Sequence, residues 1–229
     1  MAKESKESQE VLERVGTHYD REQMLIVRKM TLAAVDRIAL AVKPGMLEED
    51  AVLEGRRILK EMGLLRGWHG VRVRFGLNTL KVFRAPSEPG TLLQKDDIFF
   101  IDIGPVWQRW EGDAGNTYVV GDDPDMHRCK HDVQVIFNRV REKWRADALT
   151  GYDLYDFAAA EARSMGWELN LQTPGHRLGD FPHEALYSGS LSATHFPPTS
   201  SLWVLEIQIR HPGRPFGAFY EDLLLDQEL

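Results

Sequence analysis

The stretch "DIFFIDIGPVWQRWEGDAGNT", residues 97–117, sets two carboxylates in surroundings that should exclude them. Residues 98–104 have the pattern of an apolar β-strand, yet Asp102 lies near the middle of that run, and Asp113 follows eleven positions later. An isolated ionised carboxylate in an apolar site is costly, so proteins protonate it, pair it with a cation or bind a metal ion to it. The sequence must therefore supply one of these remedies.

Composition and charge exclude several classes of protein. The chain has 229 residues, 43% of them hydrophobic, which is enough for a substantial core in one large domain or two small ones. The net charge of -7 argues against nucleic acid or an anionic membrane surface as a partner. Cys129 is the single cysteine, and no signal-peptide or membrane-spanning pattern is present. We expect a cytoplasmic protein.

Hydrophobic periodicity predicts an alternation of helices and strands. Apolar residues recur at helical spacing in four segments and alternate as in strands in five. The expected helices cover residues 21–42, 47–63, 125–148 and 149–169, and the expected strands cover 71–75, 98–104, 116–121, 202–212 and 217–225.

Two parts of the chain echo each other. Gly45 precedes an acid-rich amphipathic helix that ends at Met62 and Gly63; Gly151 begins a similar helix, about one turn shorter, that ends at Met165 and Gly166. No linker rich in Gly, Ser or Pro separates the halves. We expect residues 1–20 to be an N-terminal arm without chemistry and residues 21–229 to be one α+β domain with two related halves.

Four carboxylates lie within strand-like segments: Asp102, Asp113, Glu206 and Glu221. The segments around Asp102 and Glu206 place no Lys or Arg within the buried alternation, and four neutral acids in one small core would be unusual. If the four converge, two divalent cations would cancel their charge.

Spacing supports convergence of the first pair. Asp102 and Asp113 flank what we expect to be a wide hairpin turn, so their side chains could face each other on adjacent strands. The segment "TPGHRLGDFPHE" adds His176 and, seven positions later, His183. Carboxylate oxygens combined with imidazole suit Mn, Co, Fe or Zn.

This order of residues resembles the pita-bread metallopeptidases, a family that includes methionine aminopeptidases, Xaa-Pro aminopeptidases and prolidases. The resemblance rests on Asp102, Asp113, the Gly-His-x-x-Gly around His176, and the strands that carry Glu206 and Glu221, and it covers roughly residues 22–225. It implies two pseudo-symmetric α-β halves with a curved antiparallel sheet covered by helices. It also implies a two-metal-dependent aminopeptidase or dipeptidase that hydrolyses the N-terminal peptide bond of short peptides.

The resemblance also implies a role for each residue. Asp102 would bind one metal ion, His176 and Glu206 the other, while Asp113 and Glu221 would bridge both. The two ions would activate a water and polarise the scissile carbonyl. Glu206 would accept the proton from that water.

His183 would hydrogen-bond the peptide or the developing oxyanion. Three positions depart from the family pattern, and at one of them Tyr220 replaces the Arg that often precedes the final Glu-Asp in Xaa-Pro enzymes. Position 84 is Arg where the family usually has His, and Arg177 follows the metal-ligating His176 where the family usually has Gly. Arginine stays protonated and cannot relay a proton, but Arg84 could bind a substrate carboxylate. The two arginines leave an acidic small-molecule substrate open.

Other interpretations remain. The same fold supports hydrolysis of a non-peptide C–N bond, as in the metal-free creatinase relatives, and it supports non-catalytic binding proteins; a homodimer is open. Taken alone, Asp102 would be a hydrogen-bonded turn residue, His176 and His183 ordinary loop histidines, and Glu206 and Glu221 solvent-facing edge residues.

Three of the histidines outside this set have a possible role at a metal site. His69, in "GWHGVRV", could substitute for the missing histidine, but we expect a structural loop residue. His127 and His131 flank Cys129 on a helix, where we expect an ordinary surface helix and no second metal site.

Overall fold

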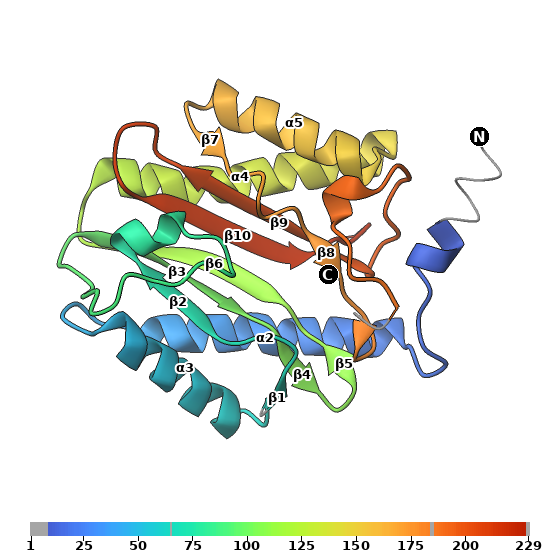
Figure 1. Cartoon of the computed structure of the whole chain (residues 1–229), viewed down its shortest axis with the longest axis horizontal. Helices are drawn as coiled ribbons and strands as arrows, with labels where there is room; N and C mark the ends of the chain where they lie inside the picture. Colours follow the sequence, from blue (N-terminus) through green and yellow to red (C-terminus); the bar gives the residue numbers. More distant parts are fainter. Residues whose placement is uncertain (1–8, 65, 184–185, 228–229) are drawn as a thin grey trace.

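A seven-stranded antiparallel sheet organises the chain, which a computed structural model describes over residues 9–64, 66–183 and 186–227. The strand order is β2-β3-β6-β10-β9-β7, and β8 pairs with β9. Helices lie along both halves of this sheet (Figure 1). The α+β expectation is confirmed.

The first half of the sheet packs on two helices. An apolar core of α2, α3 and the inner side chains of β2, β3 and β6 fills this half, with residues such as Val35, Ile58 and Phe75 fully buried. Asp20 caps α2 by accepting hydrogen bonds from the N–H groups of Glu22 and Gln23. The elements are α2 (Arg21–Ala41), α3 (Glu48–Glu61), β2 (Arg72–Phe75), the 3₁₀ turn η1 (Gly76–Leu80), β3 (Asp97–Ile103) and β6 (Ala114–Val120).

The second half repeats this arrangement with a separate core. Its helices pack on β9 and β10, and the core contains Phe137, Trp203 and Ile207. The elements are α4 (Pro124–Asp147), α5 (Gly151–Ser164), β7 (Glu168–Leu169), β8 (His176–Arg177), the 3₁₀ turn η3 (Leu191–Ala193), β9 (Trp203–Arg210) and β10 (Gly217–Leu223).

The sequence echo corresponds to matching helices in the two halves. Both α3 and α5 end at a methionine followed by a glycine with positive φ, +76° at Gly63 and +82° at Gly166. Glycine adopts this left-handed conformation without the steric cost of a Cβ, which explains the shared stop signal. The expected difference of one turn is wrong, because both helices have 14 residues.

The segment between Asp102 and Asp113 is more elaborate than the single wide turn we expected. It forms a small hairpin of β4 (Pro105–Trp107) and β5 (Trp110–Glu111), which joins β1 (Arg66–Gly67) in a separate three-stranded sheet. As expected, β3 and β6 are adjacent, but the residue opposite Asp102 is Gly115, not Asp113. Asp113 lies two positions before Gly115.

Strand register brings three carboxylates into one row across the sheet. Asp102 on β3 lies opposite Gly115 on β6, Gly115 opposite Glu221 on β10, and Glu221 opposite Glu206 on β9. Side chains directly opposite one another project from the same face of a sheet. The strand register alone therefore brings these three carboxylate side chains together on one face of the sheet.

The N-terminal arm is tied to the second half of the molecule (Figure 1). The guanidinium of Arg177, 1% exposed, donates to the carbonyls of Leu12 and Arg14 from the arm and of Leu178 and Leu202 from the domain. Arg177 therefore anchors the arm and does not add to the case for an acidic substrate, which the sequence left open. Among the described helices, none has the length and apolar character needed to cross a membrane.

Candidate metal centre

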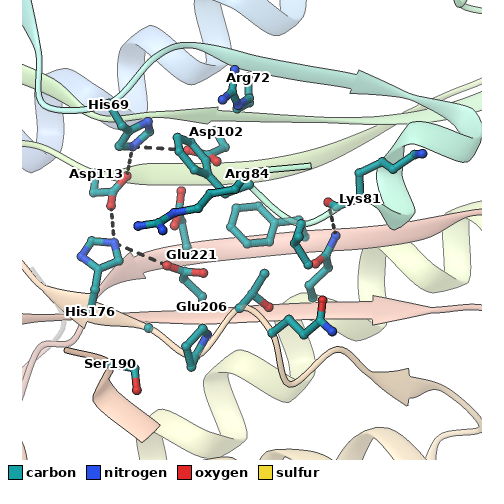
Figure 2. Close-up of a pocket in the computed structure, with 18 of the residues that line it drawn as sticks. His69, Arg72, Lys81, Arg84, Asp102, Asp113, His176, Ser190, Glu206 and Glu221 are labelled. Carbon is teal, nitrogen blue, oxygen red and sulfur yellow. Dashed lines mark hydrogen bonds and ion pairs between the residues drawn. The ribbon is translucent and has the colours of Figure 1, made fainter. Parts of the chain in front are cut away.

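A cavity of about 540 Å³ opens over the row of carboxylates. It lies between the two halves of the sheet, since the first half contributes Asp102 and Asp113 to its lining and the second half contributes His176, Glu206 and Glu221. His183 and Arg84 line the same cavity. All seven residues singled out as candidate site residues thus meet in one place (Figure 2).

Local structure explains how each ligand reaches the cavity. Asp113 precedes β6 by one residue and lies two residues from Gly115, so both face the same side of the sheet. His176 pairs with Val204 on β9, two residues from Glu206. Gly115 leaves the necessary space, because a Cβ there would lie only 2.9 Å from Glu221 Oε1.

Histidines make the close ionic contacts of these carboxylates. His176 Nε2 lies 2.8 Å from Asp113 Oδ2 and 3.4 Å from Glu206 Oε1. His69 Nε2 lies 3.1 Å from Asp113 Oδ1 and 3.5 Å from Asp102 Oδ1. Figure 2 shows the two imidazoles on either side of Asp113. Asp113 is therefore shared by both histidines.

Burial and mutual repulsion dominate the ionisation of the acids. Burial raises the pKa of Asp102 to about 6 and that of Glu206 to about 7, although His69 and His176 oppose these shifts. Burial, with repulsion from Asp113, raises the pKa of Glu221 well above its usual value. Burial would also raise the pKa of Asp113, but the charge of His69 and a hydrogen bond from His176 lower it to about 2.

The histidines respond in the opposite sense. Burial disfavours their protonated forms, yet the neighbouring carboxylates raise the pKa of both His69 and His176 to about 9. Protons on these histidines and acids thus offset part of the negative charge of the cluster.

The donor set fits divalent metal ions. Ligand atoms of His69, Asp102 and Asp113 lie within 4.8 Å of one another, and so do those of Asp113, His176 and Glu221. Glu221 Oε1 is buried and accepts no hydrogen bond from the described residues, and the buried Asp113 Oδ2 faces His176 Nε2 at 2.8 Å. A buried oxygen without a hydrogen-bond donor, alongside imidazole nitrogens, forms an environment that Mn, Co, Fe or Zn would satisfy.

Asp222, the neighbour of Glu221, shows what arginine pairing looks like in the same strand. Its side chain points to the opposite face of β10 and accepts a hydrogen bond of 2.6 Å from Arg28 Nε on α2. Asp222 is as buried as Glu221, at 2% exposed. The chain therefore supplies an arginine to one of two adjacent acids and leaves the other for the cavity.

His183 is held by a residue that sequence reasoning did not identify. Glu111, 1% exposed, accepts a short hydrogen bond from His183 Nδ1 and further bonds from the backbone N–H groups of His183, at 3.1 Å, and Gly179, at 3.2 Å. This contact assigns the proton to Nδ1 and leaves Nε2 without a protein partner in the described part of the chain. No spacing signal links Glu111 to a histidine 72 positions away.

His69 was also assigned wrongly. We expected a structural loop residue, but its side chain is 8% exposed and contacts both Asp102 and Asp113. Trp68 packs edge-on against its ring, with the ring centroids 4.4 Å apart. The motif "GWHGVRV" contained the residue, but its distance of 33 positions from Asp102 concealed the contact.

The other histidines do not join the centre. His127 and His131 are exposed on α4, as expected, while Cys129 between them is fully buried in the core. His127 Nε2 lies 2.9 Å from the carbonyl oxygen of Gly121. Within the described ranges, these residues belong to no metal-binding group.

Comparison with protein-family models identifies the family of this chain. Residues 22–227 match the model of metallopeptidase family M24, so the chain belongs to that family. The fold and the site together define a metallopeptidase of the pita-bread class. A sequence comparison with curated proteins found no significant match.

Solved structures with the same fold are distant in sequence. The methionine aminopeptidase of Thermotoga maritima is 18% identical with a TM-score of 0.72, and the match covers 93% of this chain and 96% of that one. The X-Pro aminopeptidase of Thermotoga maritima MSB8 is 16% identical (TM-score 0.67; 88% and 58% covered). The prolidase of Pyrococcus furiosus is 16% identical (0.65; 90% and 59%). The chain thus spans less than two thirds of the latter two proteins.

Proposed function

We propose that the protein is a two-metal-dependent aminopeptidase or dipeptidase that hydrolyses the N-terminal peptide bond of short peptides. One observation carries this proposal: Asp102, Asp113, His176, Glu206 and Glu221 converge on one cavity, and their ion pairs in the described part of the chain are with histidines alone. A cavity of about 540 Å³ has room for a short peptide.

The position of each residue determines which of the two ions it would bind. Asp102, with Asp113 and Glu221, would hold one ion, and His176 and Glu206, with the same two bridging acids, would hold the second. Bound divalent ions would supply an activated water and polarise the scissile carbonyl. Two ions, moreover, offset the charge of four carboxylates that burial otherwise keeps partly protonated.

Two side chains would move or hold protons. Glu206 would accept the proton of the attacking water. His183 presents Nε2 to the substrate carbonyl, and Glu111 fixes the orientation of its ring. His69, next to Asp102 and Asp113, is an additional candidate ligand at the first ion.

The site also suggests conditions for the activity. Carboxylate and imidazole donors favour Mn, Co, Fe or Zn, and the buried Cys129 suits a reducing cytoplasm. Arg84 is our candidate for binding the substrate away from the scissile bond.

Metal analysis combined with peptide assays tests the proposal. Protein reconstituted with Mn²⁺ or Co²⁺ should bind about two ions per chain and release the N-terminal residue from Met-Ala or Ala-Pro, and a chelator should abolish the release. A protein that binds no divalent ion would contradict the proposal.

The same assay separates the two rival functions. Metal-loaded protein that cleaves small amides but no peptide would indicate a hydrolase of non-peptide C–N bonds. Metal-loaded protein that cleaves neither would favour a non-catalytic binding protein.

A further inference from the structure

Three arginines line the cavity on the side of the first half of the sheet. Arg72 and Arg74 lie on β2, and Arg84 lies on the segment that follows η1; we refer to them as the arginine cluster. In Figure 2, Arg72 lies beyond Asp102, the side chain of Arg84 is drawn across the space between Asp113 and Glu221, and Ser190 lies beyond His176 and Glu206. Lys81, which also lines the cavity, already pairs with Glu88 at 2.8 Å.

The arginine cluster has no carboxylate partner within the described residues. Arg84 forms no hydrogen bond or ion pair there, and Arg72 contacts the ring of Phe83, with Cζ 4.5 Å from its centroid. Arg74, 2% exposed, donates from Nη2 only to the carbonyls of Val82, Phe83 and Ala85. Arg74 therefore fixes the segment that carries Arg84.

Unsatisfied donors accompany this excess of positive charge. Arg72 Nε, Arg74 Nε and Arg74 Nη1 are buried and have no hydrogen-bond partner. Burial lowers the pKa of Arg74, and repulsion from Arg72 lowers it further. A buried guanidinium without an anion is costly, as is a buried carboxylate without a cation.

Metal binding would sharpen this imbalance. Arg72 lies directly opposite Asp102 in the strand pairing. Once divalent ions offset the four carboxylates, the arginine cluster would lose its nearest compensating charge. A carboxylate on the substrate would then supply it.

We propose that the cavity selects substrates that carry a free carboxylate, which Arg84 and Arg72 bind beside the metal centre. The inference rests on the proposed function and names its substrate class. Guanidinium groups suit carboxylates because they offer two parallel N–H donors. The carboxylate is either an acidic side chain or the C-terminal carboxylate of a dipeptide.

Matched peptide pairs distinguish the two sources. Glu-Ala amide against Gln-Ala amide tests the side chain, and Ala-Ala against Ala-Ala amide tests the C-terminus. In at least one pair, the carboxylate peptide should show about 10- to 100-fold higher kcat/KM with Mn²⁺-loaded protein, as expected for a charge-assisted hydrogen bond. Arg84→Gln and Arg72→Gln should each lower that ratio by about tenfold, whereas Arg56→Gln, on the exposed surface of α3, should not.

Calorimetry gives a readout that does not depend on turnover. Glutamic acid α-amide should bind the metal-loaded protein about tenfold more tightly than glutamine α-amide, or alanine more tightly than alanine amide, and Arg84→Gln should remove the difference. Equal binding and equal kcat/KM within both pairs would overturn the inference, as would ratios that both arginine variants leave unchanged.

The two proposals fail in different ways. Hydrolysis of charged and neutral peptides at equal rates would leave the proposed function intact and remove the carboxylate preference. If no peptide is cleaved, the proposed function fails, and the calorimetric comparison alone decides whether the arginine cluster binds a carboxylate.

Discussion

The two halves of the sheet bring different chemistry to one cavity. The first half supplies Asp102 and Asp113 together with His69 and the arginine cluster, while the second half supplies Glu206 and Glu221 together with His176. The pKa of Asp113 falls to about 2, whereas those of Glu206 and Glu221 rise. Of Asp102 and Asp113, Asp113 is thus the one whose charge is offset, by His69 and by His176 from the second half, because the pKa of Asp102 also rises, to about 6.

This asymmetry arises on one fold used twice. Each half packs two helices on its own strands, and each has its own apolar core. The two halves can use similar helices and cores, because burying an apolar face requires only that apolar residues recur at helix or strand spacing. The polar residues that line the cavity differ between the two halves.

The largest expected effect comes from removing a second-half acid. Glu221→Gln should lower metal binding and reduce peptide hydrolysis by about 1,000-fold or more, because metal ions contribute several kcal/mol to such reactions. In the metal-free protein the same change should raise Tm at alkaline pH, where Glu221 loses its proton despite its raised pKa, since it removes a charge from a buried, mutually repelling cluster. Metal analysis, peptide assays and thermal unfolding measure the three effects.

An exposed acid provides the matched control. Glu168, 49% exposed at its side chain, pairs with Arg210 far from the cavity. Glu168→Gln should change neither metal content nor rate, because surface ion pairs contribute little. A metal-free Glu221→Gln protein less stable than the wild type at alkaline pH would contradict the charge argument.

The next effect concerns the orientation of His183. Glu111→Gln should lower kcat by about 10- to 100-fold with a smaller change in KM, as is usual for partners that orient a functional histidine. The double variant Glu111→Gln with His183→Ala should be no slower than His183→Ala alone, because both changes remove one unit. Additive losses would show that Glu111 acts independently of His183.

Stability of the metal-free protein should depend on pH with a defined sign. Raised pKa values of Asp102 and Glu206, about 6 and 7, and of His69 and His176, about 9, mean that the folded state binds protons more tightly than the unfolded chain. Their stabilising contribution is present at low pH and is lost as pH rises through these values. Tm should therefore fall between about pH 6 and about pH 9.

Metal should reverse that dependence. The ligands must lose their protons to bind an ion, so uptake should release protons and become tighter as pH rises. Calorimetry in buffers of different ionisation enthalpy counts the protons. If the Tm of the metal-free protein instead rises from about pH 6 to about pH 9, the folded protein already offsets the negative charge of these acids without a metal ion.

The smallest effect on activity should come from Arg177. Arg177→Met would remove the donors to the arm carbonyls of Leu12 and Arg14 and to the carbonyl of Leu178, and should cost about 1 to 3 kcal/mol of unfolding free energy. Peptide hydrolysis should change little, because the guanidinium points away from the cavity. Denaturant unfolding and peptide assays distinguish this anchoring role from a role in substrate binding.

Sequence patterns predicted the parts of the protein that depend on local order. Helices and strands followed from apolar periodicity, and the paired stops at Gly63 and Gly166 followed from the conformational freedom of glycine. The unusual position of Asp102 within an apolar strand marked the site. Only a few residue types can occupy such positions, so their order carried the family resemblance.

Contacts between distant segments could not be predicted in this way. His69, Glu111 and Arg177 each have ordinary neighbours in sequence, and their roles depend on residues 33 or more positions away. Arg177 was noted as a cation next to His176 in the sequence, but its guanidinium donates to carbonyls of the arm. Local pattern holds no information about which distant donor meets which acceptor.

The sequence by itself determined the two α-β halves and the identity of the carboxylates, because periodicity and misplaced charge are local properties. The tertiary structure decided that Asp102, Gly115, Glu221 and Glu206 form one row, since that depends on strand register. It also decided which cations lie near the row. Electrostatic energy depends on distance in space, and only the folded chain sets those distances.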